Sequence, residues 1–236
     1  RKAFIADEDS VLMAYDYSQI ELRLLAHLAQ VESLITAFNE DVDIHEQTAK
    51  DVFDLSEVSK EERQLAKAVN FGIIYGISDF GLAEQLGISR KDAKVYIEKY
   101  LATYPEIAKY MDDVVAFCEE HGYVTTIMHR RREIPEIKSS NFMVKSFGKR
   151  AAMNAPIQGS AADLIKIAMN RIYTRMQALN LKSKMLLQVH DELIFNVKND
   201  EIDIMETLIQ DAMSTAMDLS VPLKSDGSKA LDWYEL

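Results

Sequence analysis

Residues 59–76 read S-K-E-E-R-Q-L-A-K-A-V-N-F-G-I-I-Y-G, and the stretch predicts a helix. Ser59 followed three residues later by Glu62 is a capping-box pattern, so we expect the helix to begin near Lys60. Two cations and two aromatic rings then recur at every fourth position: Arg63, Lys67, Phe71 and Tyr75. Steps of four residues place these side chains in one stripe along the helix, which we call the α-helical stripe.

A stripe that joins cations to rings suits a ligand with a polyanionic end and a flat end. A nucleoside triphosphate has that shape, because guanidinium and ammonium groups can bind its phosphates and rings can contact its base and sugar. The alternative is a core helix with incidental Lys and Arg, and spacing alone leaves it open.

Composition favours a well-folded, mostly helical protein of one or two domains. The chain has 236 residues, 48% of them hydrophobic, with eight Gly and four Pro. Cys118 is the single cysteine, which excludes an intramolecular disulfide framework and fits a reducing cytosol. No apolar run reaches membrane-spanning length. The chain opens at Arg1 without an initiator Met, so we expect a fragment of a longer protein.

The net charge of −11 conceals a basic block. Residues 124–175 hold ten Lys and Arg against three Asp and Glu, a local charge of +7, which leaves −18 for the rest. Phosphate binding is a local electrostatic matter, so this block is compatible with nucleic-acid binding. A solvated helical face is the alternative for any one of its members.

Acidic residues follow the predicted strands of the two chain ends. A strand over 11–15 ends at Asp16, and a hairpin over 185–197 turns at His190, Asp191 and Glu192. If these strands share a sheet, the acids converge at one edge. Two carboxylates about 4 Å apart repel by about 4 kcal/mol at an effective dielectric near 20. Mg²⁺ would relieve that repulsion, because it prefers carboxylate and phosphate oxygens.

Further helices and one hairpin are expected between these ends. A helix within 39–54 carries His45, and a single His is more often structural than a ligand contact. The segment 124–137 reads as a small hairpin or loop that presents three arginines. The other expected helices cover 19–28, 89–104, 106–121, 145–180 with a break at Ala155–Pro156, and 201–219.

Three motifs in order resemble the polymerase motifs of the family A DNA polymerases, and of the bacterial members in particular. They are D-Y-S-Q-I-E-L-R (16–23), R-Q-L-A-K-A-V-N-F-G-I-I-Y-G (63–76) and Q-V-H-D-E-L-I-F (188–195). The resemblance extends from A-F-I-A at residue 3 to D-W-Y-E-L at the C-terminus. It implies template-directed addition of deoxynucleotides to a primer 3′-hydroxyl with release of pyrophosphate, in DNA replication and repair. It also implies a monomer of the bacterial cytoplasm, without a membrane partner.

The family's architecture implies an α+β fold, with a small antiparallel palm sheet and a largely helical fingers subdomain. The palm would comprise 1–30 and 151–236, and the fingers 31–150. The family's thumb would precede Arg1, so this fragment is expected to bind primer-template DNA poorly. The alternative function is therefore a nucleotide-binding module without turnover. A two-metal nuclease is a further rival, but it leaves the α-helical stripe without a role.

The resemblance also implies residue roles. Two Mg²⁺ ions would be held by Asp16, Asp191 and the Tyr17 carbonyl, with Glu192 as a secondary acid. Lys67 would contact the triphosphate and donate a proton to pyrophosphate. The other implied nucleotide contacts are Arg63, His45, Phe71, Tyr75, Gln19 and the steric gate Glu21. The implied contacts with primer-template DNA are Arg150, Asn154, Gln158 and His190.

One position departs from the family pattern. His129 stands where the family has Gly before the triple arginine. We expect a positive φ there, which His tolerates better than most residues.

Overall fold

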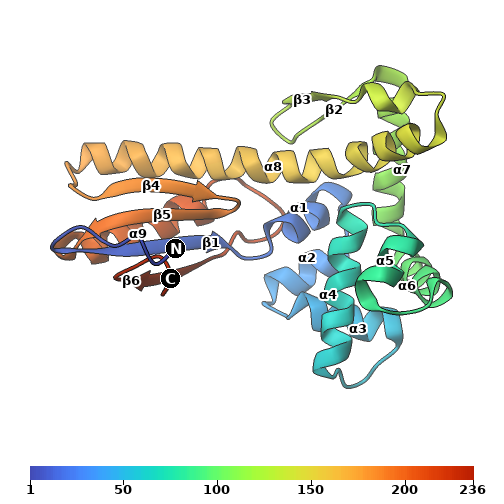
Figure 1. Ribbon diagram of the computed structural model, residues 1–236, viewed down its shortest axis with the longest axis horizontal. Helices are drawn as coiled ribbons and strands as arrows, with labels where there is room; N and C mark the ends of the chain where they lie inside the picture. The colour runs from blue at the N-terminus through green and yellow to red at the C-terminus, as the bar shows by residue number, and fades with distance from the viewer. The chain divides into compact units, whose positions relative to one another are not determined.

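The computed structural model describes residues 1–236, which form two compact units (Figure 1). The first unit contains residues 1–20 and 161–236, and the second contains residues 21–160. No helix is both long enough and apolar enough to span a bilayer.

A four-stranded antiparallel sheet forms the first unit, in the order β4-β5-β1-β6. β1 and β5 are buried along most of their length, as central strands should be, whereas β4 and β6 are largely exposed edges. The strands are β1 (Ser10–Tyr17), β4 (Lys184–Val189), β5 (Glu192–Lys198) and β6 (Ser225–Ala230). The sheet and the many helices confirm the predicted α+β class.

Helices complete the first unit. α9 (Ile202–Ser214) follows the 3-10 turn η2 (Asn199–Glu201) and packs on β5 and β6. The Tyr17 hydroxyl donates to the carbonyl of Met213 at 2.8 Å, which ties the end of β1 to α9. The buried α8 residues recur at helical spacing and face this core: Leu164, Ile165, Ala168, Ile172 and Met176.

The second unit is mainly helical. Its small antiparallel hairpin pairs β2 (Tyr123–Thr125) with β3 (Arg131–Glu133), as predicted for this segment. A 3-10 turn, η1 (Pro135–Lys138), follows the hairpin. The helices are α1 (Ile20–Ala29), α2 (Glu32–Asn39), α3 (Ile44–Phe53), α4 (Lys60–Ile74), α5 (Asp79–Leu86), α6 (Arg90–Thr103), α7 (Pro105–His121) and the first part of α8 (Phe142–Ala178).

α4 begins as predicted. The Glu62 N–H donates to the Ser59 side chain at 3.2 Å, and the Glu62 carboxylate accepts from the Ser59 N–H at 2.8 Å. This reciprocal capping box satisfies two backbone donors that would otherwise lack partners. The buried side of α4 carries Ala66, Val69, Asn70, Ile73 and Ile74. The α-helical stripe lies outside that buried set.

The predicted break at Ala155–Pro156 is wrong, because α8 runs without interruption past Pro156. Proline removes one backbone donor and normally kinks a helix. Here Ala152 and Ile157 on either side are fully buried, so packing holds the helix through the defect. The Ser160 hydroxyl also donates to the Pro156 carbonyl. Tertiary contacts therefore override the local preference.

The end of the last predicted helix also differs. α9 ends at Ser214, whereas the predicted helix continued to residue 219. The apolar Val221 and Leu223 are buried, so the chain leaves the helix early and packs these side chains into the core.

His129 has the positive φ that its sequence context predicted. Its φ is 58°, and its N–H donates to the Thr126 carbonyl at 2.9 Å within the turn between β2 and β3. The left-handed conformation costs a side-chain-bearing residue about 1–2 kcal/mol. Glycine adopts it freely.

We therefore expect His129→Gly to stabilise the chain by about 1 kcal/mol, after allowing for the greater flexibility of glycine in the unfolded state. That gain corresponds to a rise in Tm of roughly 2–4 °C. The control is Asn180→Gly, at a φ of 54°. Asn tolerates this conformation better, so its gain should be smaller. Equal Tm values for wild type and His129→Gly would contradict the claim that the positive φ of His129 destabilises the fold.

Candidate active site

The acids at the ends of β1 and β5 meet at one sheet edge. Asp16 pairs across the ladder with Glu192 on one side and with Asp226 of β6 on the other. The Tyr17 N–H donates to the Asp191 carbonyl at 3.3 Å, which fixes the hairpin tip against β1. The predicted convergence of Asp16 and Asp191 is therefore present in the first unit.

Electrostatics at this edge reflect the crowding of the acids. Partial burial, together with the negative charges of Asp191, Glu192 and Asp226, raises the pKa of Asp16 to about 6. A hydrogen bond with the Asp191 side chain acts in the same direction. Carboxylates placed this close disfavour the ionised form of each other. The structure holds no group of three or more His, Cys, Asp and Glu side chains already arranged to bind a metal ion.

Backbone strain surrounds the acids. Gln19, just after β1, has a φ of 53°, and His190, just before Asp191, has a φ of 56°. A positive φ costs free energy in a residue other than glycine, and such residues are concentrated at functional sites. Asp226 was missed by sequence reasoning, because β6 is a polar edge strand without an alternating apolar pattern.

The α-helical stripe is accessible in the second unit. Lys67 and Tyr75 are exposed, whereas Arg63 and Phe71 are half-buried. The Arg63 Nε donates to the Asp43 carboxylate at 2.8 Å. Asp43 also caps α3, accepting from the N–H groups of His45 and Glu46. Although partial burial opposes it, these hydrogen bonds and the charge of Arg63 keep the pKa of Asp43 below its usual range.

His45 lies beside the α-helical stripe but is only 2% exposed. Its ring centroid is 5.9 Å from that of Phe71, and its Nδ1 is 3.1 Å from the Asn70 amide nitrogen. Burial, with the nearby charges of Arg63 and Lys67, lowers the pKa of His45 to about 4, against the opposing effect of Asp43. His45 is therefore neutral at physiological pH.

Tyr75 and Glu21 are linked directly. The Tyr75 hydroxyl donates to the Glu21 carboxylate at 2.7 Å, although the two residues are 54 positions apart. A cavity of about 540 Å³ lies beside them, and it brings together three of the predicted site residues. Its lining consists of Phe71, Gly72, Tyr75, Ile77, Ser78, Gln85, Met143 and Arg150.

The α8 residues at four-residue spacing partly face solvent. Arg150 and Gln158 are exposed, and Asn154 is half-buried, with its amide donating to the Ile74 carbonyl at 3.4 Å. Gly76, just after α4, lies close to α8. A Cβ at this position would be 2.9 Å from the Met153 side chain and 3.1 Å from the Arg150 side chain. His190 belongs to the first unit and is exposed.

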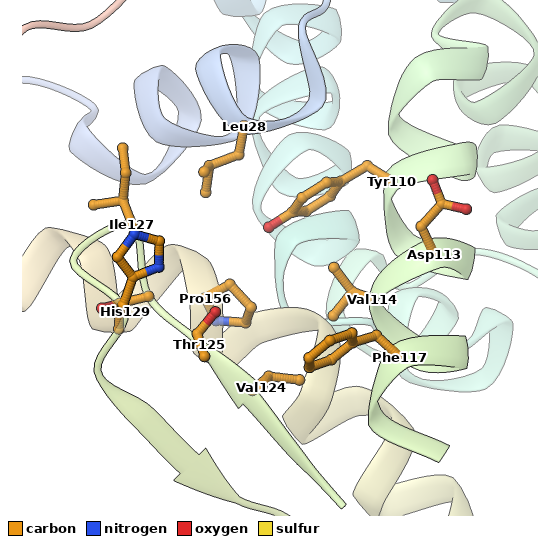
Figure 2. Close-up of a pocket in the computed structure, with 11 residues that line it drawn as sticks. Leu28, Tyr110, Asp113, Val114, Phe117, Val124, Thr125, Ile127, His129 and Pro156 are labelled. Atoms are coloured by element: carbon orange, nitrogen blue, oxygen red, sulfur yellow. The ribbon is translucent and has the colours of Figure 1, made fainter. Parts of the chain in front are cut away.

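A second cavity of the same unit, about 450 Å³, lies outside the predicted site (Figure 2). Figure 2 shows its apolar wall, formed by Val114 and Phe117 of α7, Leu28 of α1 and Pro156 of α8. His129, the departure from the family pattern, also lines it. No residue assigned to nucleotide, metal or DNA contacts in this chain lines this cavity.

Curated relatives match the whole chain. DNA polymerase I of Bacillus subtilis (strain 168) is 52% identical over 238 residues, covering 100% of this chain and 27% of that protein. DNA polymerase I of Lactococcus lactis subsp. lactis (strain IL1403) is 51% identical with the same coverage. The chain thus spans about a quarter of the length of these relatives.

A solved structure also matches. It is the POL domain of Pol1 from M. smegmatis in complex with DNA primer-template and dNTP, with a TM-score of 0.94 and 43% identity. The match covers 99% of this chain and 42% of that chain. The family model described as DNA polymerase family A matches residues 1–235. The chain therefore belongs to DNA polymerase family A.

Proposed function

We propose that this chain carries the catalytic part of a DNA-directed DNA polymerase. It adds deoxynucleotides to a primer 3′-hydroxyl under the direction of a template and releases pyrophosphate. The observation that carries the proposal is the convergence of Asp16 and Asp191 at one sheet edge. In this proposal residues 1–30 and 151–236 act as the palm and residues 31–150 as the fingers.

The residues at the acidic edge fit magnesium. Asp16, Asp191 and the Tyr17 carbonyl supply only hard oxygen ligands, the kind that Mg²⁺ prefers. Partial burial and the neighbouring negative charges of Asp191, Glu192 and Asp226 raise the pKa of Asp16, and a cation at this edge would offset both effects. Two bound Mg²⁺ ions would activate the attacking hydroxyl and neutralise charge on the leaving group. Asp16 and Asp191 act by holding these ions, and Glu192 supports them as a neighbouring acid.

The α-helical stripe serves the nucleotide. Arg63 and Lys67 bind the triphosphate, where negative charge accumulates as pyrophosphate departs. The Lys67 ammonium group can also donate a proton to the leaving pyrophosphate. His45 adds a further phosphate contact, and Phe71 contacts the sugar. Gln19 is assigned to the nucleotide site because it lies in the motif of residues 16–23. Tyr75 occupies the template-base position before the nucleotide is inserted.

Primer-template DNA is bound by four polar side chains in this proposal. Arg150, Asn154, Gln158 and His190 contact it near the primer terminus, largely through the minor groove. Amide and guanidinium donors there reach the N3 and O2 acceptors that every correct base pair presents. They therefore check the shape of a pair without reading its sequence.

Glu21 provides a test of sugar selection. Its carboxylate is held by the Tyr75 hydroxyl, so it presents a fixed surface that would exclude a 2′-hydroxyl. We expect Glu21→Ala to raise ribonucleotide incorporation relative to deoxyribonucleotide by roughly tenfold or more. Competing rNTP and dNTP in primer extension measures the ratio. Glu84→Ala, an exposed acid of α5, is the control. Unchanged selectivity would remove Glu21 as the gate.

The direct test is primer extension by this chain with Mg²⁺ and dNTPs at high primer-template concentration. We expect extension only by the nucleotide complementary to the template, and none after chelation of Mg²⁺. Binding of dNTP without extension would leave the chain as a nucleotide-binding module. Shortening of the primer would instead point to the nuclease alternative.

A further inference from the structure

The cavity of about 450 Å³ beside α7, which we call the α7 cavity, has a size typical of small-molecule sites. Its walls come from α1, α7, α8 and the β2–β3 hairpin, all within the second unit (Figure 2). Most of the residues that line it are apolar, and two of them, Val124 and Pro156, are buried. Such a lining favours a ligand with an apolar body, because contact with it removes apolar surface from water.

Tyr110 supplies a hydrogen-bond donor to the α7 cavity. Figure 2 shows its ring extending from α7 into the cavity, with the hydroxyl at the inner end. That hydroxyl makes no hydrogen bond within the chain, and burial alone raises the pKa of Tyr110 to about 12. The hydroxyl therefore stays protonated at physiological pH. A buried phenol normally has a hydrogen-bond partner, so this donor is available to an acceptor on a ligand.

Two further rings line the α7 cavity. Phe117 contributes one from α7, and His129 contributes an imidazole from the turn between β2 and β3. Flat side chains pack well against flat ligands, with a gain beyond the area that they bury. The cavity is therefore suited to an aromatic body.

His129 reaches the α7 cavity at a cost in backbone strain. Its φ of 58° is unfavourable for any residue with a side chain, whereas glycine adopts it freely. Glycine, however, would leave no side chain at this part of the wall. Strained residues are concentrated at functional sites. A ligand contact made by the His129 ring would explain why a strained residue stands here.

The charges at the α7 cavity favour an uncharged ligand. Asp113 is the one carboxylate that lines the cavity, and it is exposed. It forms an ion pair with Lys109 of the same helix, so its charge is balanced. A cationic ligand would have to compete with Lys109 for this carboxylate, and an anionic ligand would be repelled by it. An uncharged ligand leaves the pair intact.

We propose that the α7 cavity binds an uncharged aromatic molecule of one or two rings that carries a hydrogen-bond acceptor. The Tyr110 hydroxyl donates to that acceptor, and the His129 ring packs against the aromatic body. None of the residues proposed to contact nucleotide, metal or DNA lines this cavity. The inference therefore goes beyond the proposed function and does not depend on it.

Quinoline is the probe, because it is uncharged at neutral pH and joins two fused rings to one acceptor nitrogen. Indole is the matched compound, since it has a similar shape and a ring N–H that donates instead of accepting. Isothermal titration calorimetry of the chain alone measures the affinity for each compound. We expect saturable binding of quinoline with a Kd of about 1 mM or lower. Absence of saturable binding would overturn the proposal.

Tyr110→Phe tests the hydrogen bond. It should weaken quinoline binding roughly two- to tenfold, the usual contribution of one hydrogen bond, and leave indole binding unchanged. The Tm should not fall, because the hydroxyl has no partner in the chain to lose. Tyr173→Phe, at an exposed tyrosine of α8, is the control. Equal losses for quinoline and indole, or no loss for either, would contradict the donor role of Tyr110.

His129→Gly separates ligand contact from stability. We expect it to weaken binding of quinoline and indole roughly two- to tenfold, because it removes a ring from the wall. The same variant is expected to raise the Tm, so a loss of affinity could not be attributed to unfolding. An unchanged affinity for both compounds would refute the contact with His129.

Val114→Trp tests the location of the site, because the larger side chain would fill the α7 cavity. Binding of both compounds should be lost. The control is Val95→Trp, which adds the same ring to an exposed position of α6. Undiminished binding by a folded Val114→Trp variant would place the ligand elsewhere and overturn the proposal. If that variant does not fold, Tyr110→Phe and His129→Gly still decide the question.

Discussion

Replacing Asp191 with alanine should lower the rate of Mg²⁺-dependent nucleotide incorporation about 10³-fold or more, equivalent to roughly 4 kcal/mol in the barrier. Asp191 shares the acidic edge with Asp16 and is proposed to hold Mg²⁺ with it. Its removal takes away ligands that no neighbouring side chain can replace in the same place. Single-turnover primer extension measures the effect.

Measuring the stability of Asp191→Ala distinguishes a loss of catalytic activity from a loss of folded protein. The pKa of Asp16 is raised to about 6, so ionisation of Asp16 destabilises the fold as pH rises through that value. Removing the Asp191 charge relieves part of this repulsion. The variant should therefore be at least as stable as wild type at pH 8 without Mg²⁺. Because Asp16 is only partly buried and solvent screens its charge, we expect a gain of no more than about 1 kcal/mol.

Asp226 supplies a matched control. It also lies across from Asp16 and contributes to its raised pKa, but it carries no proposed role in metal binding. Asp226→Ala should leave incorporation within about threefold of wild type, since an exposed charge pair contributes less than about 1 kcal/mol. Full activity of Asp191→Ala, or equal losses in both variants, would contradict the assignment.

Lys67→Ala should reduce kcat by about 10²–10³-fold, the usual cost of removing a group that stabilises charge in the transition state. Lys67 is exposed on the α-helical stripe, between Arg63 and Phe71. The affinity for primer-template DNA should change little, because Lys67 is proposed to act on the triphosphate. Steady-state primer extension gives kcat, and fluorescence anisotropy with labelled primer-template gives Kd.

The control for Lys67 is Lys50→Ala in α3, where the ammonium pairs with Glu46 at 2.7 Å on the surface. Such exposed pairs contribute little to stability or function. If Lys67→Ala weakened DNA binding as much as turnover, Lys67 would be a contact of the DNA backbone instead of the nucleotide.

Local chemistry explains which features could be predicted from sequence. The capping box of Ser59 and Glu62 acts within four residues, so it is visible in sequence and present in the structure. The hairpin with its charged tip at Asp191 was visible as two apolar β runs, although β4 is a largely exposed edge strand in the structure. The positive φ at His129 was predicted from the family resemblance, because the family has glycine at this position. The roles assigned to the site residues stay predictions.

Features set by tertiary contacts were not predictable. Pro156 favours a break locally, and only the packing of the surrounding helix faces overrides it. β6 has an exposed, polar sequence and becomes a strand because β1 presents an unpaired edge. The partnership of His45 with Asn70 joins residues 25 positions apart through a buried network. No periodicity in the sequence could place those two side chains together.

The ion pair between Arg63 and Asp43 has a consequence for ligand choice. Any anion that approaches this guanidinium meets a group whose Nε already donates to the Asp43 carboxylate. A small anion such as inorganic phosphate would gain little from that exchange. A triphosphate long enough to reach both Arg63 and Lys67 recovers the loss at the second cation. If the chain binds nucleotides as proposed, the ion pair with Asp43 would therefore favour a full triphosphate over smaller phosphates.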